Sequence, residues 1–216
     1  MEATEVETGL PRELGGLSKQ ERILWSTVRM AVENGFESVA VDDVVERAGV
    51  SRSSFYRLFE SLEECMFAAY ERVINALVAH VTRAFEGPGS WPQRISRALG
   101  ALLEAYAAEP EVARMATVEV PAAGPESRRR YHDALKRLLP LFREGRAYAE
   151  GETLPADTEL VAIGGAEAII FREVVADRTE ELPTLLPDIL FTVLVPYVGP
   201  DAAATEVLRT RSLSPR

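Results

Sequence analysis

Residues 41–59 constrain the fold of this chain most, because they predict two short helices joined by a tight turn. Apolar residues recur at helical spacing through the first half and end at Ala48. Gly49 follows, and glycine adopts most readily the left-handed conformation that stops a helix. The hydroxyl of Ser51 can then cap the next helix. Two helices joined by a glycine turn are typical of a helix-turn-helix motif.

The residue pattern of the second helix predicts an inner and an outer face. Phe55 and Phe59 share one face, four positions apart, and are expected in the core. The opposite face is small, polar and basic, which fits the major groove of DNA. We therefore predict contacts to double-stranded DNA from six residues: Ser51, Arg52, Ser53, Ser54, Tyr56 and Arg57.

The distribution of charge excludes a protein that coats nucleic acid without regard to sequence. The 216 residues carry a net charge of −10. Residues 18–66 contain six basic and nine acidic side chains, so this region is acidic as well. From Arg47 to Phe59, however, there are three arginines and no acid. Positive charge is thus concentrated where the groove would be met.

The remainder of the chain predicts an all-α body. Apolar residues recur at helical spacing in six further segments, and no strand pattern or internal repeat is present. The segments span about 62–85, 91–108, 110–120, 125–148, 157–177 and 185–198. The first has a wider apolar surface than a three-helix head needs, so we expect it to join two cores. The predicted domains are a flexible arm (1–17), a DNA-binding domain (18–66), a ligand-binding and dimerisation domain (67–200) and a flexible tail (201–216).

The supply of catalytic groups is poor. The only histidines are His80 and His132, and no glycine-rich phosphate loop, catalytic triad or metal-ligand spacing is present. Cys65 is the single cysteine, and we interpret it as a buried small side chain, with a redox switch as the alternative. We expect no enzyme activity, no cofactor and no metal. The absence of a signal peptide and of a membrane-spanning apolar run predicts a cytoplasmic protein without a membrane partner.

The head resembles the tetracycline-repressor (TetR) family. The resemblance rests on ENGFESVAVDDVVERAGVS and RSSFYRLFESLEEC, at residues 33–51 and 52–65. It implies an all-α fold of about nine helices. The first three would bind DNA, the next four would enclose a small-molecule cavity, and the last two would pair with those of a second subunit. It also implies that the Tyr56 hydroxyl contacts a phosphate.

The sequence departs from the family pattern in three places. Val39 and Ala40 stand at the start of the second helix, where the family usually has Thr or Ser, and Leu62 stands where a Lys commonly holds a phosphate. Leu58 replaces an aromatic residue or His. We therefore expect Ser51, Tyr56 and Arg57 to provide more of the backbone contacts, and operator binding to be weak and strongly salt-dependent.

The body supplies candidates for two further surfaces. Inward-facing aromatic and polar residues predict the ligand pocket: Tyr70, Ile74, Tyr106, Met115, Glu119, Phe142, Phe171 and Arg172. A small-residue cluster and the apolar run at 185–198 predict the dimer interface: Gly164, Gly165, Ala168, Leu186, Ile189, Leu190, Val193, Leu194 and Tyr197. If neither Glu119 nor Arg172 faces the cavity, an apolar ligand is expected.

These observations predict a homodimeric repressor that binds a palindromic operator and is released by a small molecule. An activator or a ligand-independent regulator would share the same fold. The acidic head also leaves open a helical protein-interaction module with weakened DNA binding.

Overall fold

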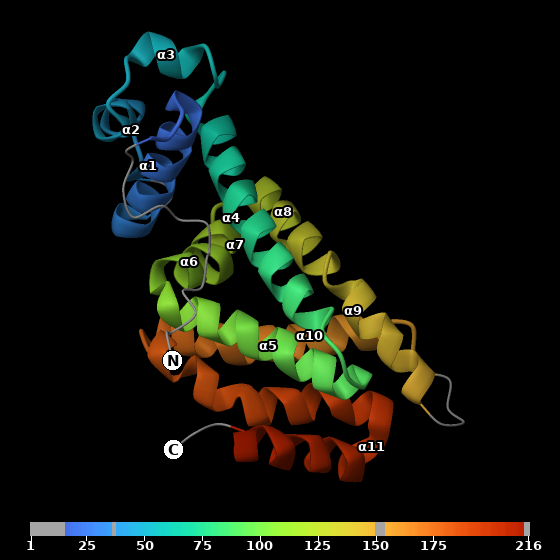
Figure 1. Ribbon diagram of the computed structural model, residues 1–216. Helices are drawn as coiled ribbons and strands as arrows, with labels where there is room; N and C mark the ends of the chain where they lie inside the picture. Colours follow the sequence, from blue (N-terminus) through green and yellow to red (C-terminus); the bar gives the residue numbers. More distant parts are fainter. Residues whose placement is uncertain (1–15, 36–37, 150–153, 214–216) are drawn as a thin grey trace.

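The computed structural model describes residues 16–35, 38–149 and 154–213, and these ranges contain helices and no strand. A small head formed by α1 to α3 lies at one end of the molecule, and the long helix α4 connects it to a larger body (Figure 1). The prediction of an all-α fold with a three-helix head is confirmed.

The head consists of α1 (Lys19–Asn34), α2 (Val41–Ala48) and α3 (Arg52–Tyr56). A capping box opens α1, because Ser18 N–H donates to Glu21 Oε2 over 2.9 Å and Glu21 N–H donates to Ser18 Oγ over 3.2 Å. Each helix buries at least one apolar side chain in a common core. Ile23, Val44 and Phe55 are all fully buried there.

Helix α4 (Leu62–Phe85) packs on α1 in the head and on α5 in the body. Its bounds agree with the segment predicted from the sequence. Cys65 near its first turn and Phe85 at its last residue are both buried, so the helix contributes to the core at both ends. Helix α4 therefore links the core of the head to that of the body.

The body contains the remaining elements. In chain order these are α5 (Trp91–Ala108), α6 (Pro110–Arg114), η2 (Met115–Glu119), α7 (Val120–Ala122), α8 (Pro125–Lys136), α9 (Leu139–Arg143), η3 (Glu144–Tyr148), α10 (Thr158–Val175), η4 (Thr179–Leu185) and α11 (Leu186–Leu213). The η2 turn is a π-helix. The helix expected at 125–148 is interrupted just before Pro140, which cannot donate a backbone hydrogen bond. Helices α5, α10 and α11 form the base of the molecule (Figure 1).

The C-terminal segment differs from its prediction. Residues 201–213 are helical rather than a flexible tail, and Ala203 is fully buried. Gly199 lies inside α11 with φ 74° and ψ 167°, a conformation that breaks the helix and turns the chain back (Figure 1). Residues 1–15 of the predicted arm and 214–216 of the predicted tail lie outside the described residues.

The segment Thr179–Arg211 is long and apolar enough to cross a membrane by length and composition, with a mean hydropathy of 1.5 over 18 residues. No membrane-spanning segment was expected from the sequence. One third of this window, 33%, is buried within the body, and the break at Gly199 divides the helix. Core helices of globular domains have the same composition, so a membrane span does not follow from it.

Candidate DNA-binding surface and ligand cavity

The turn between α2 and α3 has the predicted geometry. Gly49 adopts the left-handed conformation with φ 62° and ψ 42°, and its N–H donates to Glu46 O over 3.1 Å. Ser51 then caps α3, because its Oγ accepts a hydrogen bond from Ser54 N–H over 3.1 Å. This turn fixes the orientation of α3 relative to α2.

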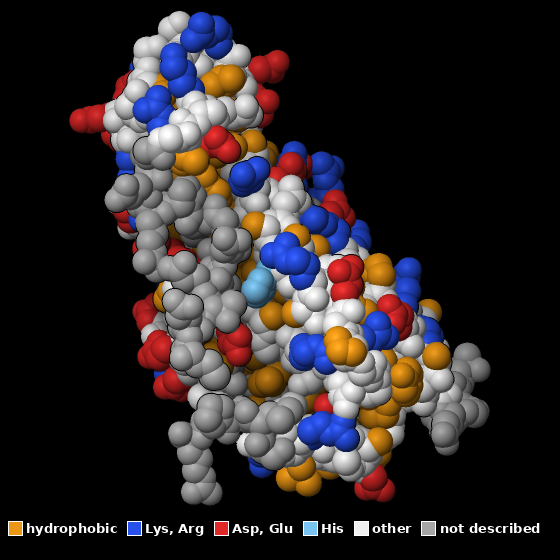
Figure 2. All heavy atoms as spheres, in the orientation of Figure 1, with side chains coloured by type: hydrophobic (Ala, Val, Ile, Leu, Met, Phe, Trp, Pro, Cys, Tyr) orange, Lys and Arg blue, Asp and Glu red, His pale blue; other side chains and the backbone are white. Residues whose placement is uncertain are grey.

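The outer face of α3 is exposed at the end of the molecule. The side chain of Arg52 is 58% exposed and Tyr56 is 48% exposed, while Ser53 and Arg57 are exposed as well. Phe55 beneath them is fully buried and packs against Phe59, with ring centroids 5.6 Å apart. Figure 2 shows basic side chains gathered at this end of the head. The face therefore presents two arginines and two hydroxyl groups to solvent.

Both arginines are held by neighbouring side chains. Arg52 Nη1 donates to Asp42 Oδ1 over 2.7 Å, and the guanidinium lies 5.8 Å from the Tyr56 ring centroid. Arg57 Nη2 donates to Ser54 Oγ over 3.2 Å. These contacts limit the conformations of both side chains before DNA is met.

The side chains of Ser54 and Arg47 lie near this face but are turned away from it. Ser54 is only 6% exposed, and its hydroxyl lies 3.0 Å from Ser51 Oγ. It therefore supports Arg57 from below the surface, and we withdraw it as a direct DNA contact. Arg47, the third arginine of the cluster, donates to both carboxylate oxygens of Glu33, the second over 2.6 Å.

The body encloses a cavity between α4, α5, η2, α8, α9 and α10. Its empty space is about 900 Å³ when the opening to solvent is included. Four of the predicted pocket residues line it, namely Tyr70, Ile74, Tyr106 and Phe142. Most of the remaining lining is aliphatic. The cavity is thus suited to an apolar ligand.

The other four predicted pocket residues lie elsewhere. Met115 is buried but does not line the cavity, and Glu119 pairs with Arg114 over 3.2 Å. Phe171 is 43% exposed, and the Arg172 side chain is 63% exposed and donates to Glu173 over 2.6 Å. Successive helical residues are separated by about 100°. Ile170 faces the cavity, so Phe171 and Arg172 are turned away from it.

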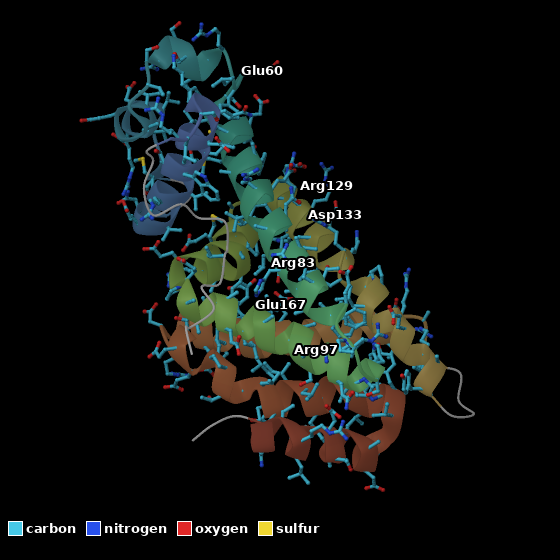
Figure 3. The ribbon with its side chains drawn as sticks, in the orientation of Figure 1. Glu60, Arg83, Arg97, Arg129, Asp133 and Glu167 are labelled. Atoms are coloured by element: carbon cyan, nitrogen blue, oxygen red, sulfur yellow. The ribbon has the colours of Figure 1, made fainter. Side chains whose placement is uncertain are left out.

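Three polar residues that line the cavity were missed: Thr117, Tyr131 and Glu167. Figure 3 shows Glu167 within the body. A glutamate in a helix is usually assigned to solvent, which hid its role. The available signal was its spacing, because Glu167 lies four residues after Ile163 and three before Ile170, both of which line the cavity.

The predicted dimer interface needs a correction on α11. Five of its predicted residues are at most 1% exposed in the single chain: Ile189, Leu190, Val193, Leu194 and Tyr197. Leu186 is partly buried against the same core, and Gly165 lies against Thr192 of α11. The five buried side chains therefore pack within one subunit, where α11 contacts α5 and α10, rather than on an exposed surface.

A different apolar surface is exposed on α10 and α11. We call it the α10 face; it consists of Leu160, Val161, Gly164, Ala168, Phe171, Val175 and Phe191. Val161 is 72% exposed, and Leu160 and Val175 are each 50% exposed. The α10 face retains Gly164 and Ala168 from the predicted set. Exposed apolar surfaces of this kind are typical of protein interaction sites.

The remaining candidates for reactive chemistry are the single cysteine and groups of possible metal ligands. Cys65 is fully buried with its Sγ 3.3 Å from Thr27 Oγ1, and burial raises the pKa of its thiol to about 11. The thiol therefore stays protonated, which argues against the redox switch. Among the described residues, no group of three or more His, Cys, Asp or Glu side chains is placed to hold a metal ion.

Residues 23–69 match the family model described as bacterial regulatory proteins, tetR family. The chain belongs to the TetR family. It is therefore a transcriptional regulator with a helix-turn-helix DNA-binding domain, in a family of regulators rather than enzymes. The matched residues cover α2 and α3 and most of α1, together with the start of α4.

Sequence relatives and solved structures agree with this assignment. The regulator EthR of Mycolicibacterium smegmatis is 25% identical over 147 residues, 65% of this chain and 67% of EthR. The repressor KstR of the same species is 33% identical over 101 residues, 45% of this chain and 50% of KstR. FadR of Bacillus halodurans, a fatty acid degradation regulator, superimposes with a TM-score of 0.73 at 17% identity, covering 82% of this chain and 95% of FadR. FadR of Bacillus subtilis in complex with stearoyl-CoA superimposes with a TM-score of 0.69 at 17% identity, covering 83% of this chain and 98% of that protein.

Proposed function

We propose that this regulator is a cytoplasmic homodimeric repressor that binds a palindromic operator and releases it when a small molecule fills the body cavity. The observation that supports this most directly is the path of α4. Tyr70 and Ile74 of α4 line the cavity, while Cys65 of the same helix lies in the core of the head. A ligand that shifts α4 would change the separation of the two heads.

The DNA side of the proposal rests on the exposed face of α3. Two heads of a dimer would meet half-sites about 34–36 Å apart, one turn of the double helix. In each half-site, Arg52 and Ser53 stand at the start of α3, where side chains reach base edges. Tyr56 and Arg57 would contact the phosphates on either side.

Replacement of Arg52 tests this assignment. An arginine that contacts a guanine contributes about 1–3 kcal/mol to discrimination, so we expect Arg52→Ala to weaken operator binding by roughly 10- to 100-fold. Arg143→Ala, which removes an exposed arginine from α9, is the control and should bind like the wild type. Both are measured by gel shift against the DNA upstream of the gene, at fixed salt.

Replacement of Asp42 should change operator affinity in the opposite direction to replacement of Arg52. Its carboxylate occupies one side of the Arg52 guanidinium and would stand near DNA phosphates. Asp42→Ala should therefore tighten operator binding. Equal affinity of the wild type and both variants would exclude this face as the DNA contact, and no shift of any DNA at low salt would favour the helical protein-interaction module.

Arg57 tests the backbone contacts separately from the base contacts. A phosphate contact weakens all sequences equally, and its loss should reduce the salt slope of log K by about 0.9. We expect this for Arg57→Ala in a salt titration of operator binding. An unchanged slope would place Arg57 away from the DNA.

The ligand side of the proposal rests on the cavity lining. The lining is mostly aliphatic and aromatic, and neither Glu119 nor Arg172 belongs to it. FadR of Bacillus subtilis, which shares this fold, was solved with stearoyl-CoA. We propose an elongated, mostly apolar effector that favours a conformation with low operator affinity. A compound that binds the cavity without changing operator affinity would refute this coupling.

A further inference from the structure

The apolar cavity contains one polar group of side chains, which we call the Glu167 cluster. It consists of the Glu167 carboxyl on α10 and the tyrosines Tyr70 on α4, Tyr106 on α5 and Tyr131 on α8. Burial raises the pKa of Tyr106 above its usual value, and the nearby Tyr70 and Glu167 raise it further, so these three groups lie close together. Four helices thus each contribute one polar residue to the lining of the same cavity.

The polar atoms of this cluster lack partners of their own. The hydroxyls of Tyr70 and Tyr131 are buried and make no hydrogen bond, although the two residues are only 2% and 7% exposed. Glu167 has no hydrogen bond or ion pair within the described part of the chain. Burial alone raises the pKa of its carboxyl above the usual range. Unsatisfied polar groups of this kind are costly, and each is a candidate for ligand recognition.

The cavity also lacks a positive charge. No Lys, Arg or His is among the residues that line it. Arg137 stands in the neighbouring groove between α4 and α8, where it donates to Asn75 Oδ1 over 2.8 Å. Thr117 already donates its hydroxyl proton to Ala113 O over 2.8 Å. No basic side chain in the cavity lining therefore pairs with the half-buried Glu167 carboxylate.

We propose that the effector is an organic amine with a largely apolar body, whose ammonium group pairs with Glu167. The ammonium would supply the missing counter-ion, and the tyrosine hydroxyls would accept its remaining N–H groups. Aromatic rings around a cation add further attraction. A carboxylate in the same place would face the acid of Glu167 with no basic group to offset it. This inference rests on the proposed role of the cavity as the effector site.

Three probes with the same apolar body test this chemistry: 4-phenylbutylamine, 4-phenylbutanol and 4-phenylbutyrate. Binding to the full-length protein is measured by calorimetry at pH 7.5. We expect the amine to bind at least roughly tenfold more tightly than the alcohol, and the carboxylate to bind most weakly. Equal binding of amine and alcohol, or no binding of the amine, would overturn the proposal.

Glu167→Gln keeps the shape of the side chain and removes its charge. It should reduce amine affinity to that of the alcohol and leave alcohol binding unchanged. Glu104→Gln, an exposed position on α5, is the matched control and should retain the preference. If Glu167→Gln unfolded, its alcohol binding would be lost as well. Retained amine preference in this folded variant would contradict the assignment.

A pH series gives a second readout. Amine affinity should fall as the pH is lowered and Glu167 takes up a proton, because its raised pKa brings that titration nearer to neutral pH. Tyr70 and Tyr106 stay neutral over this range, since burial raises the pKa of both above the ordinary phenol value of about 10. Glu167→Gln should abolish the pH dependence. An amine that binds as expected and leaves the operator bound would preserve this inference and refute only the proposed coupling.

Discussion

Val161→Asp should convert the protein to a monomer and abolish tight operator binding. Val161 is 72% exposed in the single chain and stands in the first turn of α10, a helix with an exposed apolar face. A second copy that covered the α10 face would bury an unpaired carboxylate at this position. Linking two half-site contacts raises affinity by roughly 10²–10⁴-fold, and a monomer would lose this gain.

The measurement combines sedimentation at micromolar protein with a gel shift on the full operator. Ala79→Asp, an exposed position on α4, adds the same charge outside the α10 face and should remain dimeric. Because the Val161 side chain is exposed, the variant should keep the helical content of the wild type. A dimeric Val161→Asp would show that the subunits associate through another surface.

The head could be predicted closely because its determinants are local. The stop at Gly49, the cap at Ser51 and the inward pair Phe55 and Phe59 follow from residues at most ten positions apart. Ser54 was the exception. It is a polar residue of α3, but its hydroxyl points back toward Ser51, the residue that caps this helix.

The interface residues could not be assigned from the sequence because α11 is apolar on every side. Periodicity cannot distinguish the side that packs on the same chain from the side that meets a partner when both sides look alike. The structure resolves this by placing Ile189 and Val193 against the body. The exposed apolar residues are found mainly on α10, where Leu160, Val161 and Phe171 alternate with small residues.

The presence of a cavity in the body was predicted, but only some of the residues that line it were identified. Tyr70, Ile74, Tyr106 and Phe142 were found because each lies on an apolar stripe that faces inward. Glu167 was missed for the opposite reason, since a lone acid on such a stripe breaks the pattern. Its position in the cavity depends on how four helices meet, which sequence spacing does not specify.

Trp91→Ala should produce the largest loss of stability in the body. Trp91 is fully buried at the start of α5, and its Nε1 donates to Leu141 O over 2.8 Å. Its ring also lies 4.8 Å from that of Tyr197 on α11, measured between centroids. Truncation of a buried tryptophan costs about 3–5 kcal/mol and would leave the Leu141 carbonyl without its donor.

Gly145→Ala tests the same packing from the opposite side. A Cβ at Gly145 would lie 2.4 Å from Trp91 Cζ2, and the buried indole has no space into which to move. We expect a loss of about 1–3 kcal/mol from this single methyl group. Gly100→Ala is the matched control, because its Cβ would meet only Leu186 Cδ2 at an ordinary 3.6 Å within α5. Alanine is favoured over glycine inside a helix, so Gly100→Ala should be as stable as the wild type or more so.

All three variants are compared by urea unfolding at one protein concentration, since the stability of a dimer depends on concentration. Equal stability of Gly145→Ala and Gly100→Ala would show that Trp91 is loosely held. In that case α5 would not be fixed to α9 and α11 at this end. The α10 face, which rests on the same base of the body, would then lack the rigid support that a stable interface requires.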